Sequence, residues 1–108
     1  MLQQTGFFHN VFFWLRDGAE AADASRLADG CTAHLTGIPG VLRLTAGSPA
    51  GTERGVVDNS YCVALLMEFA NAAAHDVYQD HPDHLRFIDE CSQFWSRVQV
   101  YDVVTSVG

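Results

Sequence analysis

A phenol and two imidazoles stand close together in the segment 78–84, on either side of a proline. They belong to Tyr78, His81 and His84, and Pro82 follows His81 directly. Proline is favoured in the first turn of a helix, and the residue before it is driven out of the helical conformation. We therefore expect His81 at a helix boundary, with Pro82 in the first turn of the next helix and His84 projecting from that turn.

These residue types are suited to general acid–base chemistry. A neutral imidazole with a pKa of about 6.5 takes a proton from carbon next to a carbonyl, and a phenol donates a hydrogen bond to the resulting enolate oxygen. His84 and Tyr78 are therefore the predicted catalytic pair, and His9 is predicted to orient the substrate or the His84 ring. The other residues predicted to bind a ligand are His81 and the apolar side chains Phe13, Leu65 and Phe87.

Structural roles are the alternative for each of these polar residues. In that case His81 and His84, at a helix start, would form hydrogen bonds with free backbone groups and fix the bend. Tyr78 would anchor a short helix as a half-buried phenol. His9 would be a core histidine whose ring nitrogens are hydrogen-bonded within the protein. Both sets of roles stay open at this point.

A metal site would combine His81 and His84 with His9 or Asp83. A structural zinc site needs four convergent ligands and a catalytic one three, so the spacing disfavours this site and we expect no metal. No cofactor is expected either, because the glycines do not form a phosphate-binding motif. The two other histidines, His34 and His75, fall on predicted helices and are expected at the surface.

Length and charge restrict the class of protein. The chain has 108 residues, which corresponds to a single domain over 1–108, and its net charge is −7 with no lysine. Clustered cations hold nucleic acids and anionic membranes, so neither partner is expected.

Cys31, Cys62 and Cys91 lack metal-binding spacing and are expected to pack in the core of a cytoplasmic protein. The apolar run 7–15 is too short to span a bilayer.

The periodicity of apolar residues predicts the elements that position these side chains. Strands are predicted over 7–15, 41–46, 60–69 and 99–107, helices over 19–36, 71–78 and 84–98, and a loop over 47–59. The order β-α-β-β-α-β, with the second helix broken near Pro82, is that of the α+β ferredoxin-like fold, in which helices cover one face of an antiparallel sheet.

The first strand is apolar on both sides. Successive side chains of a strand point to opposite faces. One face would carry Phe7, His9, Val11, Phe13 and Leu15, and the other Phe8, Phe12 and Trp14. Because large aromatic side chains exposed on a sheet mark an interface, we predict a homodimer in which two sheets pack face to face.

Four segments carry motifs that recur in a known family. They are the strand-one run starting at His9, the turn 37–41 (Gly-Ile-Pro-Gly-Val), the element Tyr78-x-x-His81-Pro82-x-His84 followed by Phe87, and the stretch from Trp95 to Asp102. Together they resemble the stress-responsive A/B barrel domain, or Dabb, family. The resemblance runs from Phe8 to about Val103. It implies a ferredoxin-like monomer and a dimer whose two sheets close into an α+β barrel.

The resemblance extends more distantly to a plant polyketide cyclase of this family. It implies that Tyr78 and His84 match the catalytic tyrosine and histidine, and that His9 matches a pocket histidine. The sequence departs from the cyclase on strand three, where the run 61–63 (Tyr-Cys-Val) has no histidine.

The resulting hypothesis is a homodimer with a small apolar pocket whose polar end holds His9, Tyr78 and His84. Such a protein is expected to be stress-related or to bind a small apolar or polyketide-like ligand. The alternative is a cofactor-independent acid–base enzyme, namely a lyase, a cyclase or a monooxygenase. A third possibility is an assembly module in which the barrel serves only to dimerise.

Overall fold

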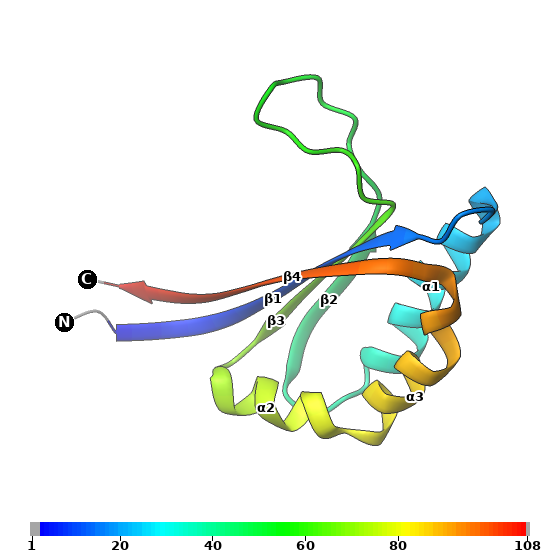
Figure 1. The fold of residues 1–108 in the computed structure, drawn as a ribbon. Helices are drawn as coiled ribbons and strands as arrows, with labels where there is room; N and C mark the ends of the chain where they lie inside the picture. Colours follow the sequence, from blue (N-terminus) through cyan, green and yellow to red (C-terminus); the bar gives the residue numbers. More distant parts are fainter. Residues whose placement is uncertain (1–2, 108) are drawn as a thin grey trace.

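The computed structural model describes residues 3–107, with side chains described over 5–106, as one four-stranded antiparallel sheet and helices on one face of it (Figure 1). The strand order is β2-β3-β1-β4. The elements are β1 (Gln3–Leu15), α1 (Ala21–Leu35), β2 (Val41–Gly47), β3 (Val63–Phe69), α2 (Ala72–Asp80), α3 (Pro82–Cys91), the 3₁₀ turn η1 (Ser92–Phe94) and β4 (Trp95–Val107). This is the ferredoxin-like α+β fold, so the predicted fold class is confirmed.

The central strand β1 divides its side chains between the two faces of the sheet. His9, Val11 and Phe13 point toward the helices and are buried, whereas Phe12 and Trp14 lie half-buried on the opposite face. β1 pairs with β4 along almost its whole length, and both strands run well beyond α2 (Figure 1). The alternation predicted for this strand is therefore present.

Helix α1 packs closely against α3 at Gly30. A Cβ atom added to Gly30 would lie 2.6 Å from the Sγ atom of Cys91, which is closer than real Cβ contacts. The absence of a side chain thus lets the two helices approach, which offsets the conformational cost of glycine in a helix. The glycine that interrupts the predicted helix consequently has a packing role.

The break between α2 and α3 falls at His81, as predicted. This residue has an extended conformation (φ −66°, ψ 138°) and its backbone N–H donates to the Tyr78 carbonyl at 3.1 Å. Its ring Nδ1 accepts a hydrogen bond from the backbone N–H of Asp83 at 3.1 Å, so the imidazole caps the start of α3. Pro82 occupies the first turn of α3, where its missing N–H costs no hydrogen bond.

The last helix is shorter than predicted. The interval 84–98 was expected to be helical, but α3 ends at Cys91 and the chain is extended from Trp95 onward. Pairing with β1 explains the difference, because Val98 lies opposite Phe13 in the ladder and the Trp95 ring packs 4.9 Å from the Phe13 ring. Strand β3 is likewise shorter than the predicted 60–69 and begins at Val63. Spacing alone does not separate an apolar helix face from the start of an apolar strand.

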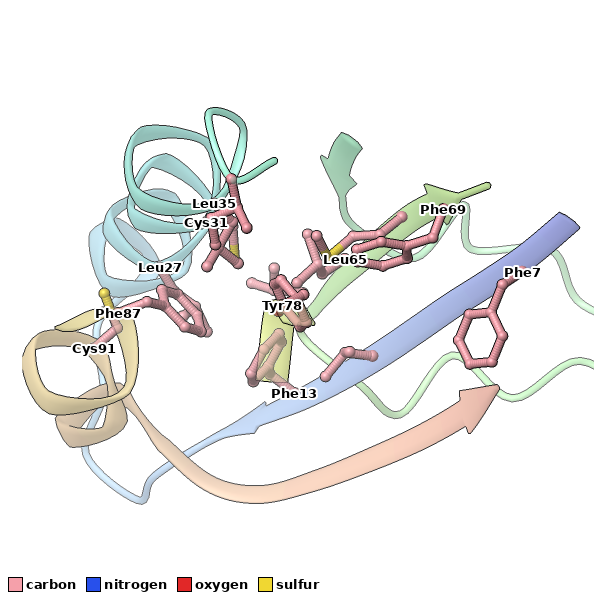
Figure 2. Close-up of a cluster of buried hydrophobic side chains, with 14 residues drawn as sticks. Phe7, Phe13, Leu27, Cys31, Leu35, Leu65, Phe69, Tyr78, Phe87 and Cys91 are labelled. Atoms are coloured by element: carbon pink, nitrogen blue, oxygen red, sulfur yellow. The ribbon is translucent and has the colours of Figure 1, made fainter. Parts of the chain in front are cut away.

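The hydrophobic core lies between the sheet and the three helices. Figure 2 shows Tyr78 near the centre of this cluster, with side chains of α1 and α3 on one side and Phe7 and Phe69 on the other. Cys31 and Cys91 are buried and Cys62 packs half-buried against the core, all as free thiols, which confirms their predicted packing role. Within residues 3–107, none of the helices has the length and hydropathy needed to cross a membrane.

Candidate functional site

A pocket of about 460 Å³ opens between the helix-covered face of the sheet and helices α2 and α3. Its wall is mostly aliphatic and aromatic, and none of the arginines within residues 3–107 contributes to it. The lining residues are His9, Val11, Phe13, Leu65, Tyr78, Gln79, His84, Phe87, Ile88, Trp95, Val98, Val100 and Asp102. A pocket of this composition suits a small, predominantly apolar ligand that is held by a few polar groups.

Tyr78 stands on the inner side of α2 at the polar end of this pocket. Its side chain is buried, and its ring lies 4.4 Å from the His84 ring and 5.6 Å from the His9 ring, measured between centroids. Burial raises the pKa of the Tyr78 phenol, and the nearby Cys31 and Asp102 raise it further. The phenol therefore stays protonated and is available as a hydrogen-bond donor.

The hydrogen bond of His84 fixes its tautomer. Nδ1 lies 3.0 Å from the backbone carbonyl oxygen of Gln79, which only accepts, so Nδ1 carries the proton and Nε2 keeps its lone pair. Burial lowers the pKa of His84 below its usual 6.5, and this effect outweighs the opposing hydrogen bond to Gln79. At neutral pH the ring is thus a neutral base that lines the pocket.

His9 is paired with a carboxylate that the sequence analysis did not single out. His9 and Asp102 lie opposite each other in the β1–β4 ladder, and Nδ1 of His9 is 2.6 Å from Oδ1 of Asp102. Burial lowers the pKa of His9 despite this partner. The neutral ring donates from Nδ1 to the carboxylate, which leaves Nε2 as an acceptor. Only the strand register identifies Asp102, and the register cannot be read from spacing.

His75 is buried in the core of the site, so its predicted surface position is wrong. Its ring stacks on Phe7 with centroids 4.5 Å apart and lies 4.7 Å from the His9 ring. His75 and Tyr78 are three residues apart on α2, which places them on one helix face. This spacing is the signal that could have identified His75, because Tyr78 was already expected to face the pocket.

The structure separates the remaining predicted residues into two groups. Phe13, Leu65 and Phe87 line the pocket, as the prediction requires of apolar walls. His81 is absent from the lining, because its ring turns back to cap α3. His34 is half-buried rather than free at the surface, and its Nε2 lies 2.7 Å from Oε2 of Glu90.

A comparison with protein-family models matches residues 7–105 to the stress-responsive A/B barrel domain. The chain belongs to the Dabb family. The sequence resemblance is therefore confirmed over nearly the whole domain. No curated protein matches this Dabb chain.

Several solved structures share the fold of this Dabb protein. A Dabb family protein with a ferredoxin-like fold from Mesorhizobium loti is 27% identical, with a TM-score of 0.77 and coverage of 98% of this chain and 100% of that one. A dimeric ferredoxin-like protein of unknown function from Thermobifida fusca is 18% identical (TM-score 0.78, coverage 97% and 95%). The hydroxynitrile lyase of Passiflora edulis is 14% identical (TM-score 0.76, coverage 94% of each chain). The latter two likenesses concern the fold alone.

Proposed function

We propose that this Dabb chain forms a homodimer in which each subunit binds one small, neutral, mostly apolar ligand. The observation that carries the proposal is the convergence of Tyr78 and His84, with ring centroids 4.4 Å apart, on one end of a mostly apolar pocket. A protonated phenol in that position suits a ligand with a carbonyl oxygen.

The charge of the pocket selects against anionic ligands. Asp102 contributes a carboxylate to the wall, while none of the six arginines of the chain does. A ligand carboxylate would lose its hydration without gaining a cation. The rings of Phe13, Phe87 and Trp95 instead offer flat apolar contacts for an aromatic or polyketide-like ketone.

Calorimetric titration of two matched probes tests this selectivity. The neutral ketone 2-acetonaphthone is expected to bind with a Kd on the order of 10–100 µM, and the anion 2-naphthoate at least about tenfold more weakly. Tyr78→Phe is expected to weaken ketone binding severalfold while leaving the fold intact. Equal binding of the two probes, or no binding of the ketone, would contradict the proposal.

The homodimer is supported by the face of the sheet that the helices leave open. Phe12 contacts Tyr61 and Tyr101 on this face, with ring centroids 5.0 and 6.0 Å apart. Leu66 and Val103 on the same face are 45% and 47% exposed. A second copy would cover these side chains, and the Thermobifida fusca relative is described as dimeric.

The stress-responsive description of the family extends the proposal to a stress-linked role. This role is tested by comparing the heat survival of cells that have and lack the protein.

Acid–base catalysis is the second candidate function, and the tautomer of His84 favours it. With Nδ1 bonded to the Gln79 carbonyl, the free Nε2 can take a proton from the carbon next to a bound carbonyl. The electrons of that C–H bond move to the carbonyl oxygen, where the Tyr78 hydroxyl stabilises the enolate. The Passiflora edulis relative is a hydroxynitrile lyase, so this fold is compatible with a lyase.

Hydrogen–deuterium exchange at the methyl group of 2-acetonaphthone tests this candidate directly. We expect the protein to accelerate the exchange in D₂O, and His84→Gln to lower the rate about 100-fold. His34→Gln is the matched control, because His34 lies outside the pocket. Unchanged exchange in His84→Gln would exclude His84 as the base, whereas ketone binding without any acceleration would leave the ligand-binding function alone.

A further inference from the structure

We propose that His9, His75 and Asp102 form a binding site for a divalent transition-metal ion, with Zn²⁺ as the representative ion. One ring nitrogen from each histidine and one carboxylate oxygen all lie within 4.8 Å of one another. The site goes beyond the proposed ligand binding, because it includes a histidine that does not line the pocket and it can be occupied without an organic ligand.

Three different elements hold the three ligands. His9 lies on β1, Asp102 lies opposite it on β4, and His75 lies on α2, which packs across the same end of the sheet. His9 and His75 are each 6% exposed, so both imidazoles are constrained by packing before any ion binds. Such rigid placement favours metal binding, since little ordering of the ligands is required.

The donor set matches the preferences of late first-row metal ions. Two imidazoles and one carboxylate form a frequent ligand set for catalytic zinc and for other divalent ions such as Co²⁺ and Fe²⁺. The ring centroids of His9 and His75 are 4.7 Å apart, which is compatible with both rings pointing at one ion. A bound ion would replace the proton that His9 and Asp102 share across 2.6 Å.

The position of the site fits an ion with open coordination positions. Three protein ligands leave at least one position for water or a ligand atom. His9 and Asp102 belong to the pocket wall, so the ion would sit at the polar end of the pocket, near Tyr78. In the described part of the chain, no arginine lines this region to compete for the carboxylate.

Packing is the alternative role of His75, because its ring also stacks on Phe7. The substitution His75→Phe separates the two roles, since it keeps an aromatic ring against Phe7 and removes the nitrogens. On β4, the substitution Asp102→Asn removes the negative charge of a proposed metal ligand and keeps the shape of the side chain.

Metal titration of the 108-residue chain tests the site. The protein is used without a histidine tag and after treatment with a chelator, with Zn²⁺ alone as the calorimetric probe and Co²⁺ as the spectroscopic probe. We expect one Zn²⁺ per chain with a Kd on the order of 1 µM or below, and at least about tenfold weaker binding for His75→Phe and for Asp102→Asn. Co²⁺ is expected to give visible absorption bands that both variants lose.

One control variant and three contradicting outcomes complete the test. His34→Gln removes an imidazole outside the cluster and is expected to leave Zn²⁺ affinity unchanged. Wild-type affinity in a folded His75→Phe variant, or no Zn²⁺ binding by the wild type up to about 1 mM, would overturn the proposal. Loss of binding in His84→Gln with full binding in His75→Phe would also overturn it, by moving the metal to another set of histidines.

Discussion

The two faces of the sheet carry similar aromatic side chains but differ in what surrounds them. On the helix-covered face, Phe13 is 2% exposed, and the same face holds the buried His9. On the opposite face, Phe12 and Trp14 are only half-buried, and the Arg97 guanidinium lies 4.1 Å from the centre of the Trp14 ring. One strand thus contributes to a core and pocket on one side and to an open aromatic surface on the other.

This difference shows where proton chemistry can be placed in a small fold. Burial lowers the pKa of His9 and His84 and raises that of Tyr78. The covered face therefore keeps two histidines neutral, as bases, and one phenol protonated, as a hydrogen-bond donor. Among the described residues, no histidine lies on the open face, where Tyr61 and Tyr101 pack against Phe12. This difference is the basis of our proposal that the covered face binds the ligand and that the open face mediates assembly.

The largest expected effect comes from Phe13→Ala on the covered face. Removing this ring leaves a cavity in the core, and we expect the free energy of unfolding to fall by about 3–5 kcal/mol in denaturant titrations. Val56→Ala in the exposed loop is the control and is expected to change stability by less than about 0.5 kcal/mol. Similar losses in the two variants would mean that the covered face is not the core.

The adjacent substitution Phe12→Asp should leave the fold intact and disrupt assembly. A charge on the open face would have to be desolvated in the dimer, so we expect the dimer dissociation constant to rise at least about 100-fold. Sedimentation velocity measures the change, with Val56→Asp as the control. A wild-type protein that sediments as a monomer at micromolar concentration would refute the assembly role.

Lowering the pH should destabilise the metal-free protein through the covered face. The pKa values of His9 and His84 lie below 6.5 in the folded chain, so below that pH the unfolded chain binds more protons than the folded one. We expect Tm to fall by a few degrees between about pH 7 and about pH 5, measured with a chelator present. The double variant His9→Gln, His84→Gln should show a shallower decline; an unchanged slope would argue against neutral buried rings.

The smallest expected effect concerns His81, which does not line the pocket. His81 caps α3 through its ring, so His81→Ala should cost about 1 kcal/mol of stability and leave binding of 2-acetonaphthone unchanged. His81→Asn should restore most of the loss, because asparagine is a good capping residue. Weaker ketone binding by both variants would instead place His81 in the site.

Residues with strong local signals could be predicted from the sequence. The period-two pattern of strand β1 and the His81-Pro82 break both depend on neighbouring residues, and both are present in the structure. The motifs shared with the Dabb family predicted the family and supported the ferredoxin-like fold. Tyr78 and His84 could be expected to approach each other because they flank that break.

The residues that sequence analysis missed depend on long-range geometry. Asp102 meets His9 only through the β1–β4 register, 93 residues away in the chain. The spacing of His75 from Tyr78 places both on one face of α2, but the stacking of His75 on Phe7 of β1 depends on how α2 packs on the sheet. The helix end at Cys91 was missed for a similar reason, since the strand from Trp95 is stabilised by its partner β1.

The five histidines of the chain offer the most direct test of the central claim that the covered face holds the ligand site. NMR can follow the Cε1–H signal of each ring while 2-acetonaphthone is added to the metal-free protein. We expect His84 and His9, which line the pocket, to shift most, and His34 and His81 to stay in place. Shifts confined to His34 or His81, or saturating shifts of none of the five, would contradict the account.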